Sequence, residues 1–217
     1  MSSAERAKKE QRNQECCKVS EEIKQRAADM EKEIIAERRY FHKHPELSLK
    51  ETETANALCW RLASMGIEYT RVPGNGIIAT IKGTAPDAYD AEGNPCRRIA
   101  LRSDIDALPV TELTGAAYAS ENEGVMHACG HDCHMSMLLG AARILLGMTD
   151  EIHGEVRLLF QPAEELGLGA KAMVDAGLLA DVSAAIGAHN NPNYAPGQIA
   201  VGPEPMMAGC VKFRVTL

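Results

Sequence analysis

Apolar positions near the start of the chain recur at helical spacing. Five of them lie three, four or seven residues apart, which predicts a helix from Ser20 to Lys43 with Ser20 as its N-cap. Residues 1–19 are charged and lack such an apolar face, so we expect a loose tail or a frayed helix start there. The five positions are Ile23, Ala27, Met30, Ile34 and Phe41.

A second helix is predicted from Ser48 to Met65. Ser48 followed three residues later by Glu51 has the spacing of a capping box, in which two side chains satisfy the first backbone N–H groups of a helix. Gly66 then follows as a natural C-cap, because glycine adopts left-handed backbone angles without steric cost.

Beyond Gly66 the period changes to that of strands. Segments 67–72 and 76–82 flank a Pro-Gly-Asn-Gly turn, and a polar loop follows from about 84 to 97. The alternation of strands and helices after this loop favours an α/β domain with a central mixed sheet and helices on both faces. We expect these strands at 98–104, 155–160 and 184–188, and the helices at 134–146 and 169–176.

Composition excludes several classes of partner. The chain has 217 residues, 45% of them hydrophobic, which suits one main domain. Aromatic residues make up only 4% and the net charge is -7, so we expect no nucleic-acid and no membrane partner. No apolar run is long enough for a membrane span or a signal peptide, and the seven cysteines are irregularly spaced. A cytoplasmic protein with reduced thiols is the expectation.

Side chains that can bind a metal are most concentrated between His127 and His134, where three imidazoles, two thiols and a carboxylate occupy eight positions. Thiolates and neutral imidazoles are good ligands for transition metals, and Cys129 and His131 flank a flexible glycine that lets both reach one site. Asp132 is a candidate for holding a ligand imidazole in its binding tautomer. The alternative is a helix N-terminus that happens to be rich in histidine and cysteine.

Two adjacent carboxylates, Glu164 and Glu165, follow an apolar strand. Neighbouring side chains in an extended segment point in different directions, so one glutamate can bind a metal while the other faces a substrate. A carboxylate of the second kind takes a proton from water in metal-assisted hydrolysis. The alternative is a solvated helix start at which acidic residues are favoured by the helix dipole.

Further candidates also stand at predicted strand ends. His189 follows an apolar strand, a position that favours a ligand although a single histidine is more often structural. Asp104 and Asp106 lie two positions apart and therefore share a face if their strand continues. One of them is expected to support a metal site, with surface salt bridging as the alternative.

Taken together, five motifs resemble one family from about residue 30 to the end, in order and in spacing. It is the hippurate hydrolase and indoleacetyl-amino-acid hydrolase branch of the aminoacylase and carboxypeptidase type of dinuclear metallohydrolases. The motifs are HPEL at 44–47, RSDIDALPVTE at 102–112, MHACGHDCH at 126–134, FQPAEE at 160–165 and GAH at 187–189.

The resemblance implies a zinc-peptidase-like catalytic domain, a role for each motif residue and a substrate class. Glu164 would be the general base and acid, and Asp106 would support the site. The wider family usually has a metal-binding histidine at the position of Asp104, and in this branch His131 would take over that role. Two divalent cations, zinc or manganese with cobalt or nickel as options, would help hydrolyse the amide bond of N-acyl amino acids. The implied metal ligands are Cys129, with a bridging thiolate, His131, Glu165 and His189.

The resemblance also bears on domain organisation. Family members continue into a lid domain that mediates assembly into homodimers or homotetramers, and then return with a final metal-ligating histidine. The alternating pattern at 211–217 stops where the first strand of that lid would begin. We therefore expect a tail at 1–19, part of the catalytic domain at 20–209 and the first lid strand at 210–217. A fragment of this kind should bind a second cation weakly and turn over little substrate.

Two other classes of protein remain open. The first is an inactive metal-binding or interaction module that needs a partner chain. The second is a structural zinc domain, but such sites usually show paired CxxC spacings, and Cys129 and Cys133 have a different spacing.

Overall fold

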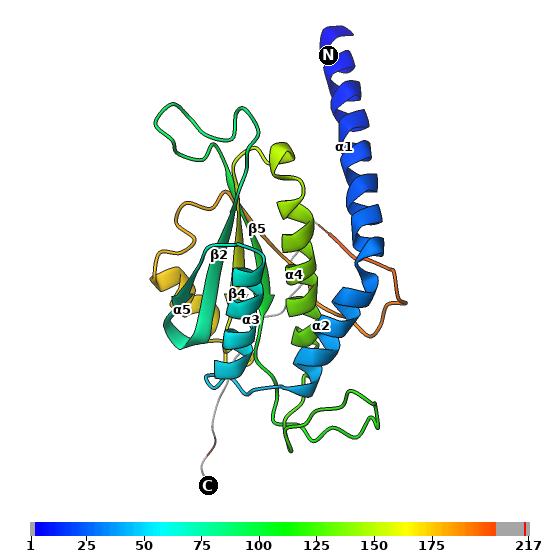
Figure 1. Ribbon diagram of the computed structural model, residues 1–217, viewed down its shortest axis with the longest axis vertical. Helices are drawn as coiled ribbons and strands as arrows, with labels where there is room; N and C mark the ends of the chain where they lie inside the picture. Colours follow the sequence, from blue (N-terminus) through cyan, green and yellow to red (C-terminus); the bar gives the residue numbers. More distant parts are fainter. Residues whose placement is uncertain (1–2, 203–214, 216–217) are drawn as a thin grey trace.

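The computed structural model describes residues 3–202 and residue 215, and it shows a five-stranded mixed sheet with helices on both faces (Figure 1). The strand order is β1-β2-β4-β3-β5. β2 pairs antiparallel with both β1 and β4, whereas β3 runs parallel to both β4 and β5. The predicted fold class is therefore confirmed. The strands are β1 (Tyr69–Val72), β2 (Gly76–Lys82), β3 (Arg98–Asp104), β4 (Glu155–Gln161) and β5 (Ala184–Gly187).

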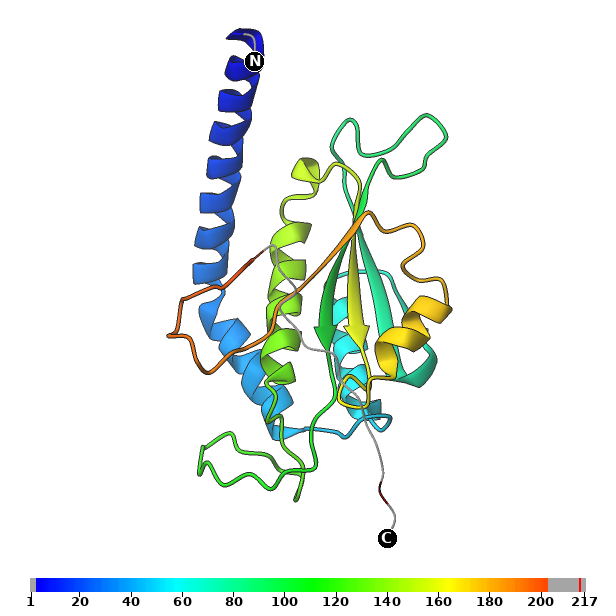
Figure 2. The ribbon, with the colours of Figure 1, turned by 180° about the vertical axis from the view of Figure 1, so that it is seen from behind.

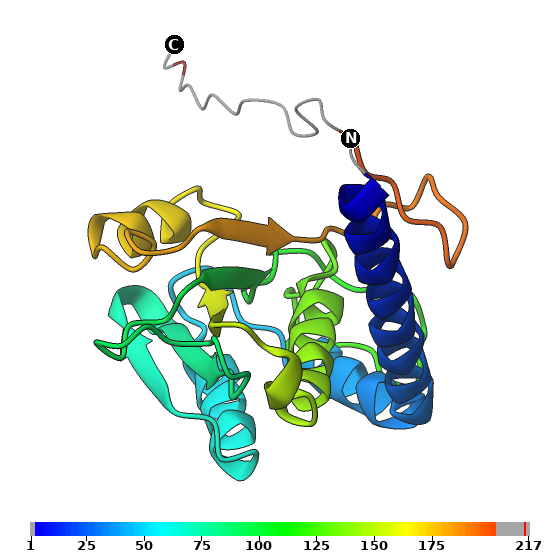
Figure 3. The same cartoon turned by 90° about the horizontal axis from the view of Figure 1, so that it is seen from above.

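Two apolar layers hold the helices against the sheet. Alternate residues of β4 point to opposite faces, so Leu158 and Phe160 enter the main core while Leu159 enters a smaller one. The main core lies under α3, α4 and part of α2, and the smaller one under α5; Figures 2 and 3 show α5 and α3 on opposite sides of the sheet. The helices are α1 (Ser3–Asp29), α2 (Glu31–Lys43), α3 (Thr52–Ser64), α4 (His131–Leu146) and α5 (Gly169–Asp175), with short 3-10 turns at Pro73–Asn75 and Thr149–Glu151.

The start of the chain differs from the prediction. Residues from Ser3 onward form one helix, α1, which extends away from the rest of the fold in Figure 1, and Ser20 lies inside it. α1 ends at Asp29, so the single helix predicted to Lys43 is two helices separated at Met30. Strong helix formers and ion pairs such as Arg26–Glu22 at 2.7 Å favour α1 without an apolar face.

The predicted capping box is also wrong. α3 begins at Thr52, and the side chain of its N-cap residue Glu51 makes no capping bond. The first-turn N–H of Thr54 donates to the Glu46 carboxylate at 2.7 Å. Ser48 instead donates a hydrogen bond to Asp106 at 2.6 Å, and the Glu51 carboxylate accepts one from the backbone N–H of Ala163 at 2.8 Å. Both side chains thus form hydrogen bonds with residues far away in the sequence, which their local spacing does not reveal.

Most other predicted elements are confirmed to within a few residues. Gly66 has a positive φ of 72° and follows α3, as a C-cap glycine should. α4 begins at His131 rather than at 134. The strand expected at 210–217 lies outside the described residues except for Val215. None of the described helices combines the length and apolarity that crossing a bilayer requires.

Candidate metal centre

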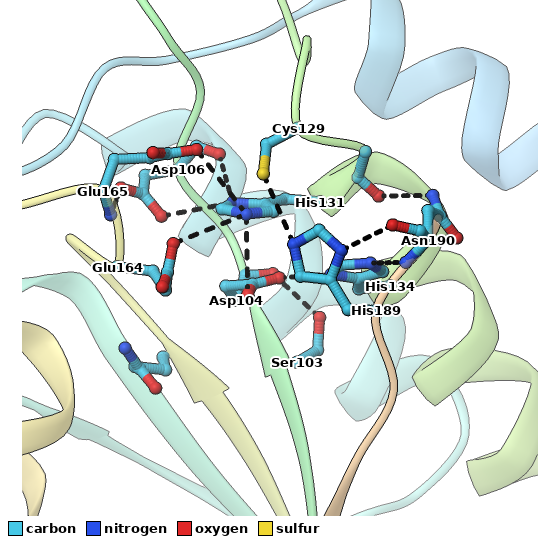
Figure 4. Close-up of polar contacts among 12 residues, drawn as sticks. Ser103, Asp104, Asp106, Cys129, His131, His134, Glu164, Glu165, His189 and Asn190 are labelled. Atoms are coloured by element: carbon cyan, nitrogen blue, oxygen red, sulfur yellow. Dashed lines mark hydrogen bonds and ion pairs between the residues drawn. The ribbon is translucent and has the colours of Figure 1, made fainter. Parts of the chain in front are cut away.

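The predicted site residues meet at one edge of the sheet (Figure 4). Asp104 ends β3, Glu164 and Glu165 follow β4, and His189 follows β5. Because these three strands are parallel, their carboxyl ends lie side by side, the usual place for a site in an α/β sheet. α4 begins at the same edge and contributes His131 from its first residue.

His131 lies at the centre of two overlapping groups of ligand atoms. In one group the ligand atoms of Cys129, His131 and His189 all lie within 4.8 Å of one another, and in the other the same holds for His131, Glu164 and Glu165. The Cys129 sulfur is 3.4 Å from Nε2 of His189. The structure therefore brings together all four residues that the sequence suggested as ligands.

The surroundings of the His131 ring fit bound cations. Its Nδ1 donates a hydrogen bond to the backbone oxygen of Asp106 at 2.8 Å. Its Nε2 is buried and has no hydrogen-bond partner among the described residues. Carboxylate oxygens of Asp104, Glu164 and Glu165 lie 3.5, 3.7 and 3.8 Å from that nitrogen, too far for hydrogen bonds. In the neutral ring, whose proton is on Nδ1, this nitrogen offers a lone pair, and with the carboxylates around it forms a donor set for divalent cations.

The electrostatics of the site favour positive charge. Burial lowers the pKa of His131, but the hydrogen bond with Asp106 and the negative charges of Asp104 and Glu165 raise it above its ordinary value overall. Burial, together with the neighbouring Glu165 and Glu164 carboxylates, raises the pKa of the Cys129 thiol to about 12. The protein alone thus keeps this thiol protonated, and a coordinated cation would be needed to hold it as thiolate.

Asp106 links two of the candidate ligands. Its backbone oxygen accepts from His131, and its Oδ2 accepts from the backbone N–H of Glu165 at 3.0 Å and from the Ser48 hydroxyl. Burial raises the pKa of Asp106, but the His131 ring beside its carboxylate and the hydrogen bonds from Ser48 and Glu165 outweigh burial and lower the pKa overall. Asp106 thus fixes the orientation of an imidazole and of the loop that carries the glutamates.

Asp104 and His134 form a buried pair. Asp104 was one of the two carboxylates expected to support a metal site, whereas no separate role was expected for His134. His134 Nδ1 lies 2.6 Å from one carboxylate oxygen of Asp104, and Arg102 lies 2.7 Å from the other. Burial raises the pKa of Asp104, but His134, His131 and Arg102 outweigh it and lower it to about 2. A signal was available, because His134 lies three residues after His131 and so shares its helix face.

Asp132 does not hold a ligand imidazole, contrary to the prediction. Its carboxylate contacts Nδ1 of His42 at 2.7 Å and Nε of Arg38 at 2.8 Å, both on α2. Consecutive residues of a helix point about 100° apart. Asp132 therefore faces α2 while His131 faces the strand ends.

Comparison with known proteins identifies relatives of this chain. Residues 100–216 match the model of peptidase family M20/M25/M40. The chain is 43% identical to an N-acetyl-L-cysteine deacetylase of Bacillus subtilis, over 87% of this chain and 43% of that protein. It is 41% identical to an N-acyl-L-amino acid amidohydrolase of Geobacillus stearothermophilus, over 92% of this chain and 52% of that protein. The resemblance seen in the motifs is confirmed.

A solved structure supports the fold in the same way. A crystal structure of a dinuclear metal-binding peptidase of the M20 family from Bacillus subtilis superposes with a TM-score of 0.70 at 42% identity, covering 76% of this chain and 45% of that one. An IAA-amino acid hydrolase of Arabidopsis thaliana is 40% identical over 85% of this chain and 40% of that protein. The chain thus spans about half the length of the curated relatives it matches.

Proposed function

Since the chain belongs to peptidase family M20/M25/M40, we propose that its protein hydrolyses the amide bond of N-acyl amino acids with the help of two divalent cations. The observation that carries the proposal is the buried Nε2 of His131, which faces three carboxylates but makes no hydrogen bond within the described part of the chain. His131 belongs to two groups of neighbouring ligand atoms, one with Cys129 and His189 and the other with Glu164 and Glu165. Its imidazole can therefore contribute to a site that uses ligands from both groups.

Four side chains would hold the cations: Cys129, His131, Glu165 and His189. A thiol with two imidazoles suits zinc, and the carboxylates also suit manganese, while cobalt and nickel fit the same mixed donor set. When bound, such cations polarise a carbonyl group and stabilise the negative charge that develops on it.

Glu164 is the proposed general base and acid. Its side chain is 36% exposed, compared with 21% for Glu165, so it presents more of its carboxylate to an incoming substrate. It would accept a proton from the water that attacks the amide carbonyl and deliver that proton to the departing amine nitrogen. Asp106 would keep the neighbouring Glu165 in place through its hydrogen bond to the backbone.

The substrate class rests on the relatives, which are named for N-acetyl-L-cysteine, N-acyl-L-amino acids and IAA-amino acids. We propose an N-acyl amino acid for this protein as well, and a homodimer or homotetramer for the assembled enzyme. We further propose a reducing compartment such as the cytoplasm, because the six described cysteines are all free and the proposed site needs a reduced thiol.

Elemental analysis of the purified chain, dialysed after loading with zinc or manganese, tests the metal centre. We expect retained cations in the wild type and a clear loss in Cys129→Ser, because serine is a much poorer ligand than a thiolate. A wild-type chain that retains no cation would refute the proposal.

Amine release from N-acetyl-L-cysteine and from an indoleacetyl amino acid tests the chemistry. Hydrolysis that depends on added metal and on Glu164 supports an amidohydrolase. Tight cation binding by a protein that releases no amine would favour the inactive metal-binding module instead.

A further inference from the structure

The segment that carries His189 has little packing to hold it. Every residue from 183 to 202 is exposed, including all of β5 and His189 itself. The pairing of β5 with β3 ends at Gly187, two residues before the histidine. Something other than burial must therefore place His189 beside Cys129 and His131.

Asn190 provides two attachments for this segment. Its backbone N–H donates to Nε2 of His134 at 3.2 Å, and its side-chain amide donates to the backbone oxygen of Gly130 at 3.3 Å. Gly130 is the residue between Cys129 and His131, so Asn190 ties the loop directly to the turn that carries both (Figure 4).

The hydrogen bonds define the tautomer of His134. A backbone N–H can only donate, so Nε2 of His134 accepts from Asn190 and carries no proton. The ring proton is therefore on Nδ1, which donates to Asp104 at 2.6 Å. Asp104, His134 and Asn190 thus form a continuous chain that connects the end of β3, the first turn of α4 and the segment after β5.

This assignment excludes His134 as a metal ligand. Ligand atoms of Asp104, His131 and His134 lie within 4.8 Å of one another, the spacing of a candidate metal group. Both nitrogens of His134 are already engaged, however, one as donor and the other as acceptor. Its ring lies 4.8 Å from that of His189 at 70°, so it supports that imidazole from the side.

Gly130 shows how closely Asn190 approaches. Its φ is +87°, which favours glycine, and a Cβ added there would lie closer to the Asn190 side-chain nitrogen than van der Waals contact allows. Glycine thus satisfies the backbone angle and leaves room for the side chain of Asn190.

We propose that His134 and Asn190 are positioning residues that form a clamp, defined as the hydrogen bonds Asp104–His134–Asn190–Gly130, which sets His189 against Cys129 and His131. Its consequence for metal binding depends on the proposed metal centre. The clamp itself belongs to the protein and can be tested without a cation.

Hydrogen exchange of the Asn190 amide, followed in the whole chain, tests the clamp directly. His134→Asn retains a donor for Asp104 but is too short to reach Asn190, and we expect the Asn190 amide to exchange about three- to tenfold faster, as for the loss of one hydrogen bond. His134→Gln places an amide oxygen near the position of Nε2 and should restore slow exchange. Equal exchange rates in the wild type and His134→Asn, or equal acceleration in both variants, would overturn the clamp.

A second variant covers the case in which His134 variants do not fold. Asn190→Ala changes an exposed side chain and removes the bond to Gly130, so segment 187–190 should exchange faster. The matched control is Asn191→Ala, whose side chain accepts only from Asn193 among the described residues. The control should behave as the wild type, and an identical profile for Asn190→Ala would contradict the proposal.

Titration with Co²⁺, followed by visible absorption, links the clamp to the metal centre. Loss of a group that orients a ligand weakens metal affinity roughly tenfold or more, so Asn190→Ala and His134→Asn should bind Co²⁺ correspondingly less tightly than Asn191→Ala. Unchanged affinity with faster exchange would overturn the positioning of His189. A wild-type chain that binds no Co²⁺ but protects the Asn190 amide would refute the proposed function and leave the clamp standing.

Discussion

Glu51 connects the start of α3 to the turn that carries both candidate glutamates. Its side chain is fully buried at 0% exposure, and its carboxylate accepts the backbone N–H of Ala163 at 2.8 Å. Ala163 has a positive φ of 49°, which is costly for a residue with a Cβ and persists only where its surroundings hold it. Glu51 thus helps fix the backbone immediately before Glu164.

The cost of removing this carboxylate follows from the contact. Glu51→Ala leaves the buried N–H of Ala163 without its acceptor, and an unsatisfied buried donor costs about 1–3 kcal/mol. Glu51→Gln retains a carbonyl oxygen for the same bond but carries no charge. We therefore expect a loss of unfolding free energy of that size for Glu51→Ala and little or none for Glu51→Gln.

The pH dependence separates charge from hydrogen bonding. Burial raises the pKa of Glu51 above its ordinary value of 4.5, although its hydrogen bonds oppose the shift. A carboxyl whose pKa is raised by folding stabilises the protein below the unfolded value, and this contribution is lost as the pH rises through the folded pKa. The stability of Glu51→Gln relative to the wild type should therefore increase from pH 4.5 to pH 8.

Urea denaturation at these two pH values measures both effects. Glu53→Ala is a matched control on the same helix, because Glu53 is exposed and accepts only from Asn56 among the described residues. The control should change the unfolding free energy by no more than about 0.5 kcal/mol. The reasoning fails if Glu51→Ala costs no more than Glu53→Ala, or if the difference between Glu51→Gln and the wild type is the same at both pH values.

Three further predictions test other parts of the site and core. In a protein that turns over, Glu164→Gln should retain its cations but lose about a hundredfold or more in kcat; an equal loss of metal would mean that the roles of Glu164 and Glu165 are reversed. Gly130→Ala should cost about 1–2 kcal/mol in urea denaturation because of its positive φ, and it should also weaken Co²⁺ binding. Leu158→Ala, at a fully buried position of the main core, should cost about 2–5 kcal/mol with its cation content unchanged.

Local patterns were enough to predict the sheet and the neighbourhood of the site. β3 was predicted at its observed bounds because an apolar strand is a feature of a few consecutive residues. Gly66 could be recognised as a C-cap for the same reason. Cys129 and His131 also share one short turn, so their sequence spacing already limits how far apart their ligand atoms can be.

The N-terminal helix shows where periodicity does not help. The part of α1 before residue 20 has no apolar face, and the helix rests there on intrinsic propensity and on side-chain pairs of the kind that Arg26 and Glu22 form later in it. The sequence contained that information, but a search for apolar periodicity does not use it.

Contacts between groups far apart in the sequence could not be predicted from local patterns. Glu51 and Ala163 are 112 positions apart, and His134 and Asn190 are 56 apart. These contacts depend on β3 lying between β4 and β5 and on the face that α4 turns toward the strand ends. Ser48 and Asp132 illustrate the same limit, since each has a plausible local role but contacts a group on another element.

Most strands and helices, the family and the residue types that a metal site needs could be predicted from the amino-acid sequence, because short segments and the order of the motifs contain that information. The folded arrangement was needed to see which nitrogen of His131 makes no hydrogen bond within the described residues, which carboxylates face it and what holds His189 in place. A hydrogen bond depends on the distance and direction between donor and acceptor, and neither is set until the strands have their order and register.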